Sequence, residues 1–224
     1  MAAAVGAADP GDAFALPTAL LRHRSEGVDA VYLPQFLAPS EAGALFTELR
    51  ARMRWQQEHV TLFGRRVAVP RWVAWAGDPD VCYRYSGVDH RCEGWSSALA
   101  RLHARVHTCL GRRFNFALAN LYRDGRDHMG WHADAELALG ERPLIASVSL
   151  GATRRFVMRR RDGGRRVSFD LADGSLLLMF GTSQVDWRHA LPRAARARGE
   201  RINVTFRRVR AASATGRSRD AAYE

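Results

Sequence analysis

The chain of 224 residues contains no lysine, only three cysteines and no long apolar run. Cys82, Cys92 and Cys109 form an odd set without Cys-x-x-Cys spacing, which argues against a disulfide framework and predicts reduced thiols. No apolar stretch approaches the roughly 20 residues that span a bilayer, and Met1 to Pro10 lacks the basic start and apolar core of a signal peptide. We therefore expect a monomeric cytoplasmic protein, in the bacterial cytosol and near the nucleoid, without membrane contact.

Because lysine is absent, all 34 basic residues are arginine, and the formal net charge is +11. Codon bias in a GC-rich genome explains arginine in place of lysine, but it does not explain the surplus over Asp and Glu. A polyanionic partner accounts better for that surplus. One basic turn, Arg159 to Arg161 with Arg165 and Arg166, could touch phosphates, and a merely solvated turn is the alternative.

The first half of the chain predicts two amphipathic helices. One starts near Ser40, after Pro39, and repeats apolar residues at every fourth position, namely Leu45, Leu49 and Met53. The other starts near Ser96 and stops at Gly111. Its apolar positions are Leu99, Leu102, Val106 and Leu110.

After Gly111 the pattern changes to short runs typical of β-strands, separated by turn signals. The predicted strands are Phe114 to Tyr122, Leu144 to Leu150, Arg155 to Met158, Val167 to Leu171, Ser175 to Phe180 and Arg201 to Val209. Helices first and strands afterward favour an α+β jelly roll whose N-terminal helices brace one sheet. We expect one domain over residues 28–210, a loose N-terminal segment over 1–27 and a loose tail over 211–224.

Two imidazoles and one carboxylate are spaced so that they could meet at one metal ion. His132 and Asp134 stand two apart, so in a strand both would face one cavity, and His189 follows in Trp187-Arg188-His189. A His-x-Asp pair alone recurs by chance, so the surroundings must support it. Three such ligands on one face of iron(II) leave the opposite positions open for a cosubstrate and dioxygen. The pattern favours a redox enzyme.

The last predicted strand alternates strictly, with polar side chains from Arg201 to Arg207 on one face and Ile, Val and Phe on the other. An ordinary half-exposed strand would give the same alternation. Upstream, Asn120 and Tyr122 again share one face of a predicted strand. A dicarboxylate needs a guanidinium at its far carboxylate and neutral donors along its length. Suitable types are present in Arg201, Tyr122, Asn120 and Asn203, which we interpret as a 2-oxoglutarate pocket.

Four segments, in this order, resemble the catalytic core of the AlkB family of iron(II)- and 2-oxoglutarate-dependent dioxygenases: FNFALANLYRDGRDHMGWHADAE, PLIASVSLGATRRF, GSLLLMFGTSQVDWRHALPR and RINVTFR. The upstream run LFGRRVAVPRWVAWAGDPDVCYRYSG resembles the nucleotide-recognition region of the homologues that repair alkylated duplex DNA. The resemblance spans roughly Val31 to Val209. It implies the double-stranded β-helix, another name for the jelly roll predicted above.

The resemblance also implies roles for matching residues around the metal. The iron(II) ligands would be His132, Asp134 and His189. The residues around 2-oxoglutarate would be Arg201 at its distal carboxylate, Tyr122 and Asn120 along it, and Asn203 and Arg207 beside the metal-proximal end. Dioxygen would be the second cosubstrate.

For the substrate base, the resemblance implies four contacts. Trp75 would belong to a loop that stacks on the extruded base, Glu136 would lie near that base, and Arg71 and Tyr83 fall in the same recognition region. Several homologues carry a second acid directly after the iron-binding Asp, and here that position is Ala135. This departure leaves the iron ligands intact and concerns the base preference.

The activity that the resemblance implies is direct-reversal repair of alkylated DNA. N-methyl groups of N1-methyladenine and N3-methylcytosine would be oxidised and released as formaldehyde, while 2-oxoglutarate is decarboxylated to succinate. One alternative is the same chemistry on RNA or on a protein side chain. The basic surplus argues against a protein substrate but does not separate DNA from RNA. Another alternative is a catalytically silent nucleic-acid-binding barrel.

Overall fold

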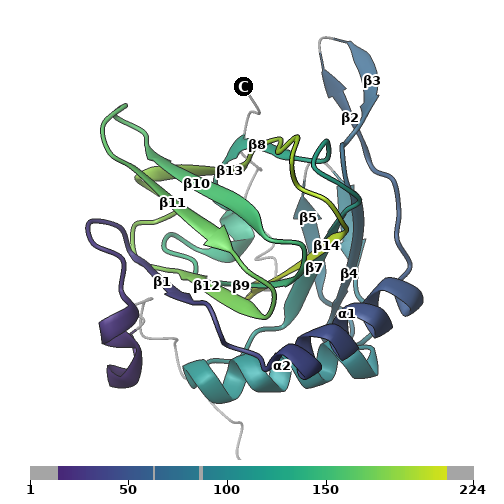
Figure 1. The fold of residues 1–224 in the computed structure, drawn as a ribbon. Helices are drawn as coiled ribbons and strands as arrows, with labels where there is room; N and C mark the ends of the chain where they lie inside the picture. Colours follow the sequence, from purple (N-terminus) through teal and green to yellow (C-terminus); the bar gives the residue numbers. More distant parts are fainter. Residues whose placement is uncertain (1–14, 63, 86–87, 211–224) are drawn as a thin grey trace, which may run out of the picture.

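Two antiparallel sheets face each other in the structure, which is a computed structural model describing residues 15–62, 64–85 and 88–210 (Figure 1). The major sheet contains, in spatial order, β1 (Ala30–Leu33), β12 (Ser175–Met179), β9 (Ile145–Gly151), β14 (Arg201–Arg207), β7 (Phe116–Tyr122) and β4 (Trp72–Gly77). The minor sheet contains β11 (Arg166–Leu171), β10 (Arg154–Arg160), β13 (Trp187–Leu191) and β8 (Met129–His132). Strands far apart in sequence are neighbours in both sheets, as the predicted jelly roll requires.

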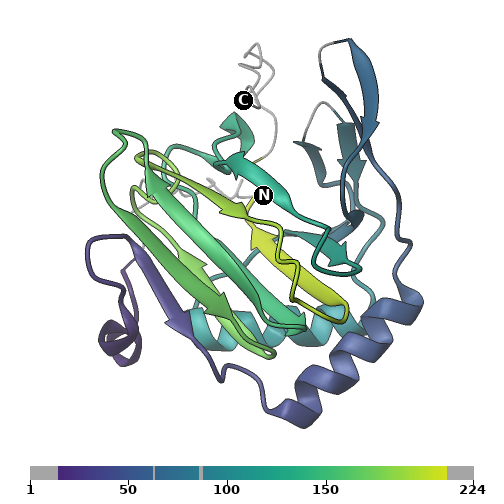
Figure 2. The ribbon, with the colours of Figure 1, turned by 45° about the horizontal axis from the view of Figure 1, so that its top comes forward.

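Two separate hairpins stand beside the β4 edge of the major sheet (Figure 2). One pairs β2 (His59–Leu62) with β3 (Arg65–Ala68), and the other pairs β5 (Cys82–Tyr85) with β6 (Val88–Arg91). Both hairpins lie close in sequence to β4, one before it and one after it. This arrangement places them on one side of the space between the two sheets.

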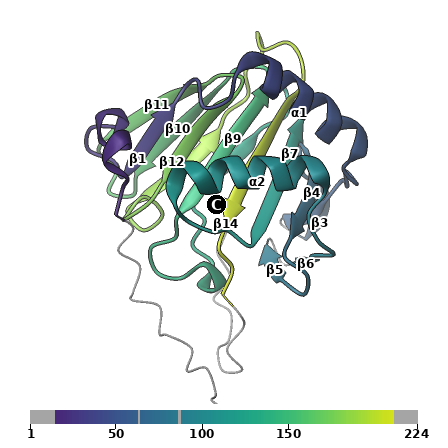
Figure 3. The ribbon, with the colours of Figure 1, turned by 90° about the horizontal axis from the view of Figure 1, so that it is seen from below.

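The two helices, α1 (Pro39–Arg52) and α2 (Ser97–Leu110), cover the outer face of the major sheet (Figure 3). Leu99 and Leu102 of α2 pack in one apolar cluster with Ile202 and Val204 of β14. A second apolar cluster fills the space between the sheets. The major sheet is therefore covered on both faces, which explains why β7 and β14 are buried along their whole length.

The strong sequence patterns predicted these elements well. The six predicted strands are present, with ends that differ by a few residues. The second helix is confirmed, because the Ser96 hydroxyl accepts a hydrogen bond from the Leu99 amide and Gly111 closes the helix with a φ of 62°. The first helix is also present, but it begins at Pro39, so Ser40 lies in its first turn and does not cap it.

Several expectations about order and extent were wrong. Strands β1 to β6 all precede α2, so the chain does not place its helices first and its strands afterward. Trp75 lies in strand β4, where we expected a loop. The predicted loose start does not reach residue 27, because Thr18–His23 forms the 3-10 helix η1 with Leu20 buried. A second 3-10 helix, η2 (Leu137–Leu139), was not predicted.

Residues 1–14 and the predicted tail at 211–224 lie outside the described residues. Within the part of the chain that the structure describes, neither long helix is apolar and extended enough to cross a membrane.

Candidate metal and cosubstrate site

A narrow cavity between the two sheets collects most of the predicted site residues. Its polar lining comes from β7, β8, β9, β13 and β14, together with Asp134 just after β8. These lining residues are Asn120, Tyr122, His132, Asp134, Ser147, His189, Arg201, Asn203, Thr205 and Arg207. Apolar side chains, including Met129, Phe156 and Leu191, complete the wall. The cavity therefore combines buried charges with a water-excluding surround.

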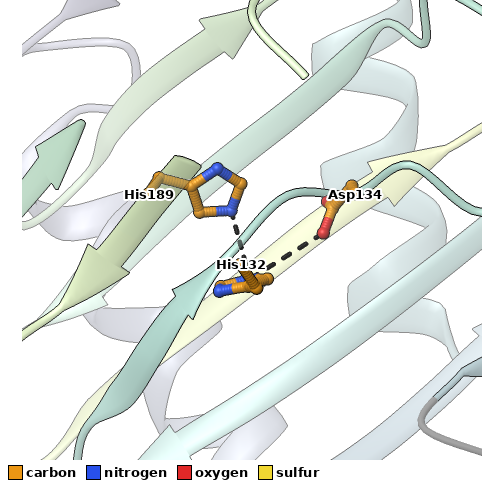
Figure 4. A group of neighbouring side chains, drawn as sticks. All are labelled: His132, Asp134 and His189. Carbon is orange, nitrogen blue, oxygen red and sulfur yellow. Dashed lines mark hydrogen bonds and ion pairs between the residues drawn. The ribbon is translucent and has the colours of Figure 1, made fainter. Parts of the chain in front are cut away.

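His132, Asp134 and His189 converge at one point in this cavity, although two of them are far apart in sequence (Figure 4). Strands β8 and β13 pair with His132 directly opposite His189, so the sheet itself brings the two imidazoles together. Their Nε2 atoms lie 3.1 Å apart, and the Asp134 Oδ1 lies 3.9 Å from the His132 Nε2. Donor atoms this close can reach one ion at the roughly 2.0–2.1 Å typical of metal–imidazole bonds.

The protonation of the two imidazoles suits metal binding. The Nδ1 of His132 lies 2.9 Å from the Gly130 carbonyl oxygen, so it carries the proton and leaves the Nε2 lone pair facing His189 and Asp134. Burial and the neighbouring His132 lower the pKa of His189 to about 3, and burial also lowers the pKa of His132. Both rings are therefore neutral at neutral pH, which is the form that binds a metal.

Asp134 lies beyond the end of β8, so the strand geometry expected for it is wrong, although it faces one cavity with His132 as predicted. Two other contacts aim its carboxylate. The Gln184 side chain accepts a hydrogen bond of 2.9 Å from the Asp134 amide, and Arg207 donates to Oδ2 at 2.7 Å. Burial alone would raise the pKa of Asp134, but Arg207 and the two imidazoles lower it. Oδ1 is buried without a hydrogen-bond partner among the described residues, as expected of a ligand atom.

Arg201 is a buried cation at the other end of the cavity. Its Nη2 donates to the Ser149 hydroxyl at 2.9 Å, and its guanidinium carbon lies 5.3 Å from the centre of the Tyr122 ring. No ion pair joins it to an acidic side chain among residues 15–62, 64–85 and 88–210, and its buried Nε lacks a hydrogen-bond partner there. Burial lowers its pKa to about 10, so it remains charged at neutral pH. A buried cation of this kind fits a carboxylate from a bound molecule.

The predicted neutral donors line the same wall. Asn120 of β7 and Asn203 of β14 are opposite each other in the sheet register, and both are buried. Arg71 donates from Nε to the Asn120 side-chain oxygen at 2.8 Å, so the side-chain nitrogen of Asn120 points away from Arg71. The Asn203 amide nitrogen donates to Ser147 and to the Val148 carbonyl. The alternation predicted for β14 is confirmed, whereas the half-exposed strand offered as its alternative is wrong.

Tyr83 and Glu136 lie next to the metal ligands. Tyr83 is fully buried, and its ring centre is 5.9 Å from the Arg207 guanidinium carbon. Its hydroxyl lies close to the Glu136 carboxyl group. Burial, with help from the Asp134 carboxylate, raises the pKa of Glu136. Arg71, Tyr83 and Glu136 therefore lie beside the site, while their contacts with a substrate stay a prediction.

Trp75 is placed differently from the expectation. It lies within β4 and is half-buried, and its indole nitrogen donates to the Arg91 carbonyl at 2.9 Å. Its ring meets the His90 ring edge-on at 4.5 Å between centres. The side chain is thus engaged with the β5–β6 hairpin and does not line the cavity that holds His132.

Sequence reasoning missed two buried residues that shape the site. Gln184 carries no motif signal, because only its distant contact with the Asp134 amide reveals its role. Arg154 of β10 donates to the carbonyl oxygens of Asp124, Asp127 and Pro192 and so holds two loops beside the cavity. The arginine-rich composition of its segment hid it, since the nearby Arg155, Arg160 and Arg161 are all exposed.

Comparison with known proteins agrees with this geometry. The family model described as the 2OG-Fe(II) oxygenase superfamily matches residues 29–207. The chain is 38% identical over 200 residues to the DNA oxidative demethylase ALKBH2 of Mus musculus, which covers 84% of this chain and 83% of that protein. It is 37% identical over 194 residues to the alpha-ketoglutarate-dependent dioxygenase alkB homolog 3 of Bos taurus, covering 82% of this chain and 67% of that protein.

A solved structure shows the same fold at lower sequence identity. The structure of OsALKBH1 aligns with a TM-score of 0.56 at 17% identity, covering 81% of this chain and 98% of that chain. Because the family match extends over most of the chain and the buried donor set fits the metal that the family name states, the chain belongs to the 2OG-Fe(II) oxygenase superfamily.

Proposed function

We propose that this protein repairs alkylated DNA by oxidative demethylation of N-methylated bases, with N1-methyladenine and N3-methylcytosine as its substrates. The observation that carries the proposal is the buried set of His132, Asp134 and His189, which faces Arg201 across one cavity, together with the lack of an acidic partner for Arg201 in the part of the chain that the structure describes. Relatives of 37% and 38% identity bear the names of an alpha-ketoglutarate-dependent dioxygenase and a DNA oxidative demethylase. These names support DNA as the substrate.

In this proposal the three converging side chains would hold iron(II), and Arg201 would bind the distal carboxylate of 2-oxoglutarate. The chemistry supplied by the loaded site is oxygenation of a substrate C–H bond by dioxygen, coupled to conversion of 2-oxoglutarate to succinate and carbon dioxide. Tyr122 and Asn120 would orient the cosubstrate along the wall of β7. Met129, Phe156 and Leu191 would exclude water from the same space.

The substrate base would enter beside Tyr83 and Glu136. Both lie next to Asp134 and neither is a member of the ligand triad, so a methyl group held against them would be close to the metal centre. A methylated base presents its methyl group on its base-pairing face, so it must leave the helix to reach a buried site. Glu136 would meet the polar edge of that base, because its raised pKa lets the carboxyl group serve as donor or acceptor.

A row of arginines on the outer face of the minor sheet supports a polyanionic substrate. In the sheet register Arg159 of β10 is opposite both Arg166 of β11 and Arg188 of β13. Met158, next to Arg159, points into the core, and it is opposite Val167 of β11 and His189 of β13 in the register. The adjacent Arg159, Arg166 and Arg188 therefore point to the outer face. Arg159 also lies 4.6 Å over the Trp131 ring. Arg159 and Arg166 are like charges directly opposite each other, an arrangement that destabilises a sheet, and a phosphate backbone would relieve that repulsion.

The direct test incubates the protein with iron(II), ascorbate, 2-oxoglutarate and oligonucleotides that each carry one methyl lesion. Single-stranded DNA, duplex DNA and RNA of the same sequence are compared, and mass spectrometry follows methyl loss while succinate is quantified. We expect methyl loss from DNA in step with succinate formation. Succinate formation without loss from any of the three nucleic acids would reject this substrate class and leave the dioxygenase assignment standing.

Removing one metal ligand should abolish both iron binding and turnover. We expect His189→Ala to lose iron-dependent succinate formation, because only two of the three donors remain, while its thermal unfolding stays cooperative. Calorimetric titration with iron(II) under nitrogen measures the binding. His107→Ala, which removes an exposed imidazole on α2, serves as the matched control and should bind iron as the parent protein does. Substantial iron-dependent activity in His189→Ala would eliminate the triad as the metal site.

Arg201→Ala should raise the 2-oxoglutarate concentration needed for half-maximal turnover. A buried carboxylate that loses its guanidinium partner typically costs about 2–5 kcal/mol, so a large increase in KM is expected. Arg201→Lys should restore only part of the affinity, because an ammonium group cannot reproduce the two parallel hydrogen bonds. The exposed Arg198, three residues before Arg201, provides the control substitution Arg198→Ala. Unchanged cosubstrate affinity in both Arg201 variants would move the dicarboxylate site elsewhere.

The arginine row predicts a salt-dependent DNA affinity. Each phosphate contact removed should flatten the slope of log affinity against log salt by about 0.9. We therefore expect Arg159→Gln with Arg166→Gln to flatten the slope measured by fluorescence anisotropy and to leave 2-oxoglutarate turnover without DNA unchanged. Arg155→Gln on the same face is the control, since Arg155 already pairs with Asp170 at 3.0 Å. An identical slope in the double variant and its parent would show that these arginines do not contact phosphates and are only a solvated surface.

A further inference from the structure

A buried ion pair outside the metal site joins the two hairpins. The Nε2 of His90, on β6, lies 2.6 Å from the Oε1 of Glu58, just before β2. The His90 side chain is fully buried and that of Glu58 is only 9% exposed. Most ion pairs of the described residues are far more exposed than this one. Solvent therefore screens the interaction between Glu58 and His90 less than it screens those pairs. Glu58 and His90 are the bridge between the base of one hairpin and the second strand of the other.

The hydrogen bonds of His90 define its protonation. Its Nδ1 lies 3.1 Å from the backbone oxygen of Tyr83, which can only accept, so Nδ1 carries a proton. Its Nε2 faces a carboxylate oxygen at 2.6 Å, which also accepts, so a second proton lies between His90 and Glu58. The pair therefore keeps one shared proton in a buried position. A charge-assisted hydrogen bond of this length is stronger than a neutral one.

The same pair is connected to the candidate active site through Tyr83. Tyr83 and His90 are opposite each other in the β5–β6 register, and His90 holds the backbone of Tyr83 directly. The Tyr83 ring packs on Phe116 of β7 at 4.8 Å between centres, and its side chain lies close to Glu136. On its other side, the His90 ring is braced by Trp75 of β4. Glu58 and His90 are thus connected to the candidate active site through a single residue, Tyr83.

We propose that the buried Glu58–His90 pair is a positioning device that fixes the β5–β6 hairpin against the base of the β2–β3 hairpin and thereby holds Tyr83 in place for the substrate. Neither residue lines the metal cavity, so the pair acts through Tyr83 and not on the reacting atoms. The part of the inference that concerns the substrate rests on the proposed function. The part that concerns the hairpin does not.

Three variants distinguish the effect of the Glu58–His90 contact from the effect of the Glu58 charge and from a general effect of substitution in the hairpin. Glu58→Ala removes the acceptor, and His90 can then become neutral by keeping only its Nδ1 proton. Glu58→Gln restores a partner, because its amide can donate to the Nε2 of a neutral His90. Asp89→Asn is the matched control, since Asp89 neighbours His90 but pairs instead with Arg84 at 3.6 Å. Both of these side chains are exposed, Arg84 by 63% and Asp89 by 60%. We expect all three variants to bind iron(II) and 2-oxoglutarate as the parent protein does.

The first readout is hydrogen exchange of the protein with iron(II) and 2-oxoglutarate under nitrogen. Peptides from Cys82–Tyr85 and Val88–Arg91 should exchange faster in Glu58→Ala, while Glu58→Gln and Asp89→Asn should match the parent protein. Exchange unchanged in Glu58→Ala would overturn the inference. If Glu58→Ala does not fold, His90→Leu is measured in the same way, and protection equal to the parent would likewise overturn it.

The second readout is demethylation of the methylated oligonucleotide. We expect Glu58→Ala to lower kcat/KM roughly 10- to 100-fold, mainly through KM, because a small misplacement of a substrate-facing wall has effects of that size. Glu58→Gln should recover most of this loss, and 2-oxoglutarate turnover without DNA should stay within about twofold of the parent. Faster exchange with an unchanged KM would reject the positioning role. A parent protein without demethylase activity would reject the proposed function instead, and the exchange data would still decide whether the pair holds the hairpin.

Discussion

The ion pair between Arg207 and Asp134 is the interaction on which the rest of the site depends. Enclosing a guanidinium inside a protein is costly unless a carboxylate is close, and here the two groups lie 2.7 Å apart with both side chains almost fully buried. Arg207 comes from the major sheet and Asp134 follows β8 of the minor sheet by two residues, so the pair also joins the two sheets. Since it occupies one carboxylate oxygen, only the other is directed at the imidazoles.

Strand β14 carries two buried arginines whose surroundings differ, and this difference organises the cavity. Arg207 has its carboxylate within the protein, and Asp134 raises its pKa although burial alone would lower it. Arg201, at the other end of the strand, lies over Tyr122 and bonds to Ser149, while burial lowers its pKa. One end of β14 therefore completes the metal centre, and the other end is suited to an incoming carboxylate. A cosubstrate with two acidic ends fits the space between them.

The parts of the fold that could be predicted are those with long local patterns. Helix α2 has an apolar residue at each turn, a serine cap and a terminal glycine, and each of these signals lies within the segment itself. The hairpin strands and β8 have only four residues each, too few for an alternation to be recognised. The resemblance implied a loop at Trp75, but pairing with β7 makes its segment a strand. The composition of a segment does not show which distant strand it will pair with.

The sequence by itself determined which chemical groups are available: two imidazoles and a carboxylate in a known order, and an alternating strand with arginines at Arg201 and Arg207. The tertiary structure alone decided how these groups act. Pairing of β8 with β13 sets His132 opposite His189, and burial keeps both rings neutral. The contact of Glu58 with His90 was equally invisible, since 32 residues separate them. Protonation and proximity both depend on what surrounds a side chain after folding, and the order of residues along the chain does not contain that information.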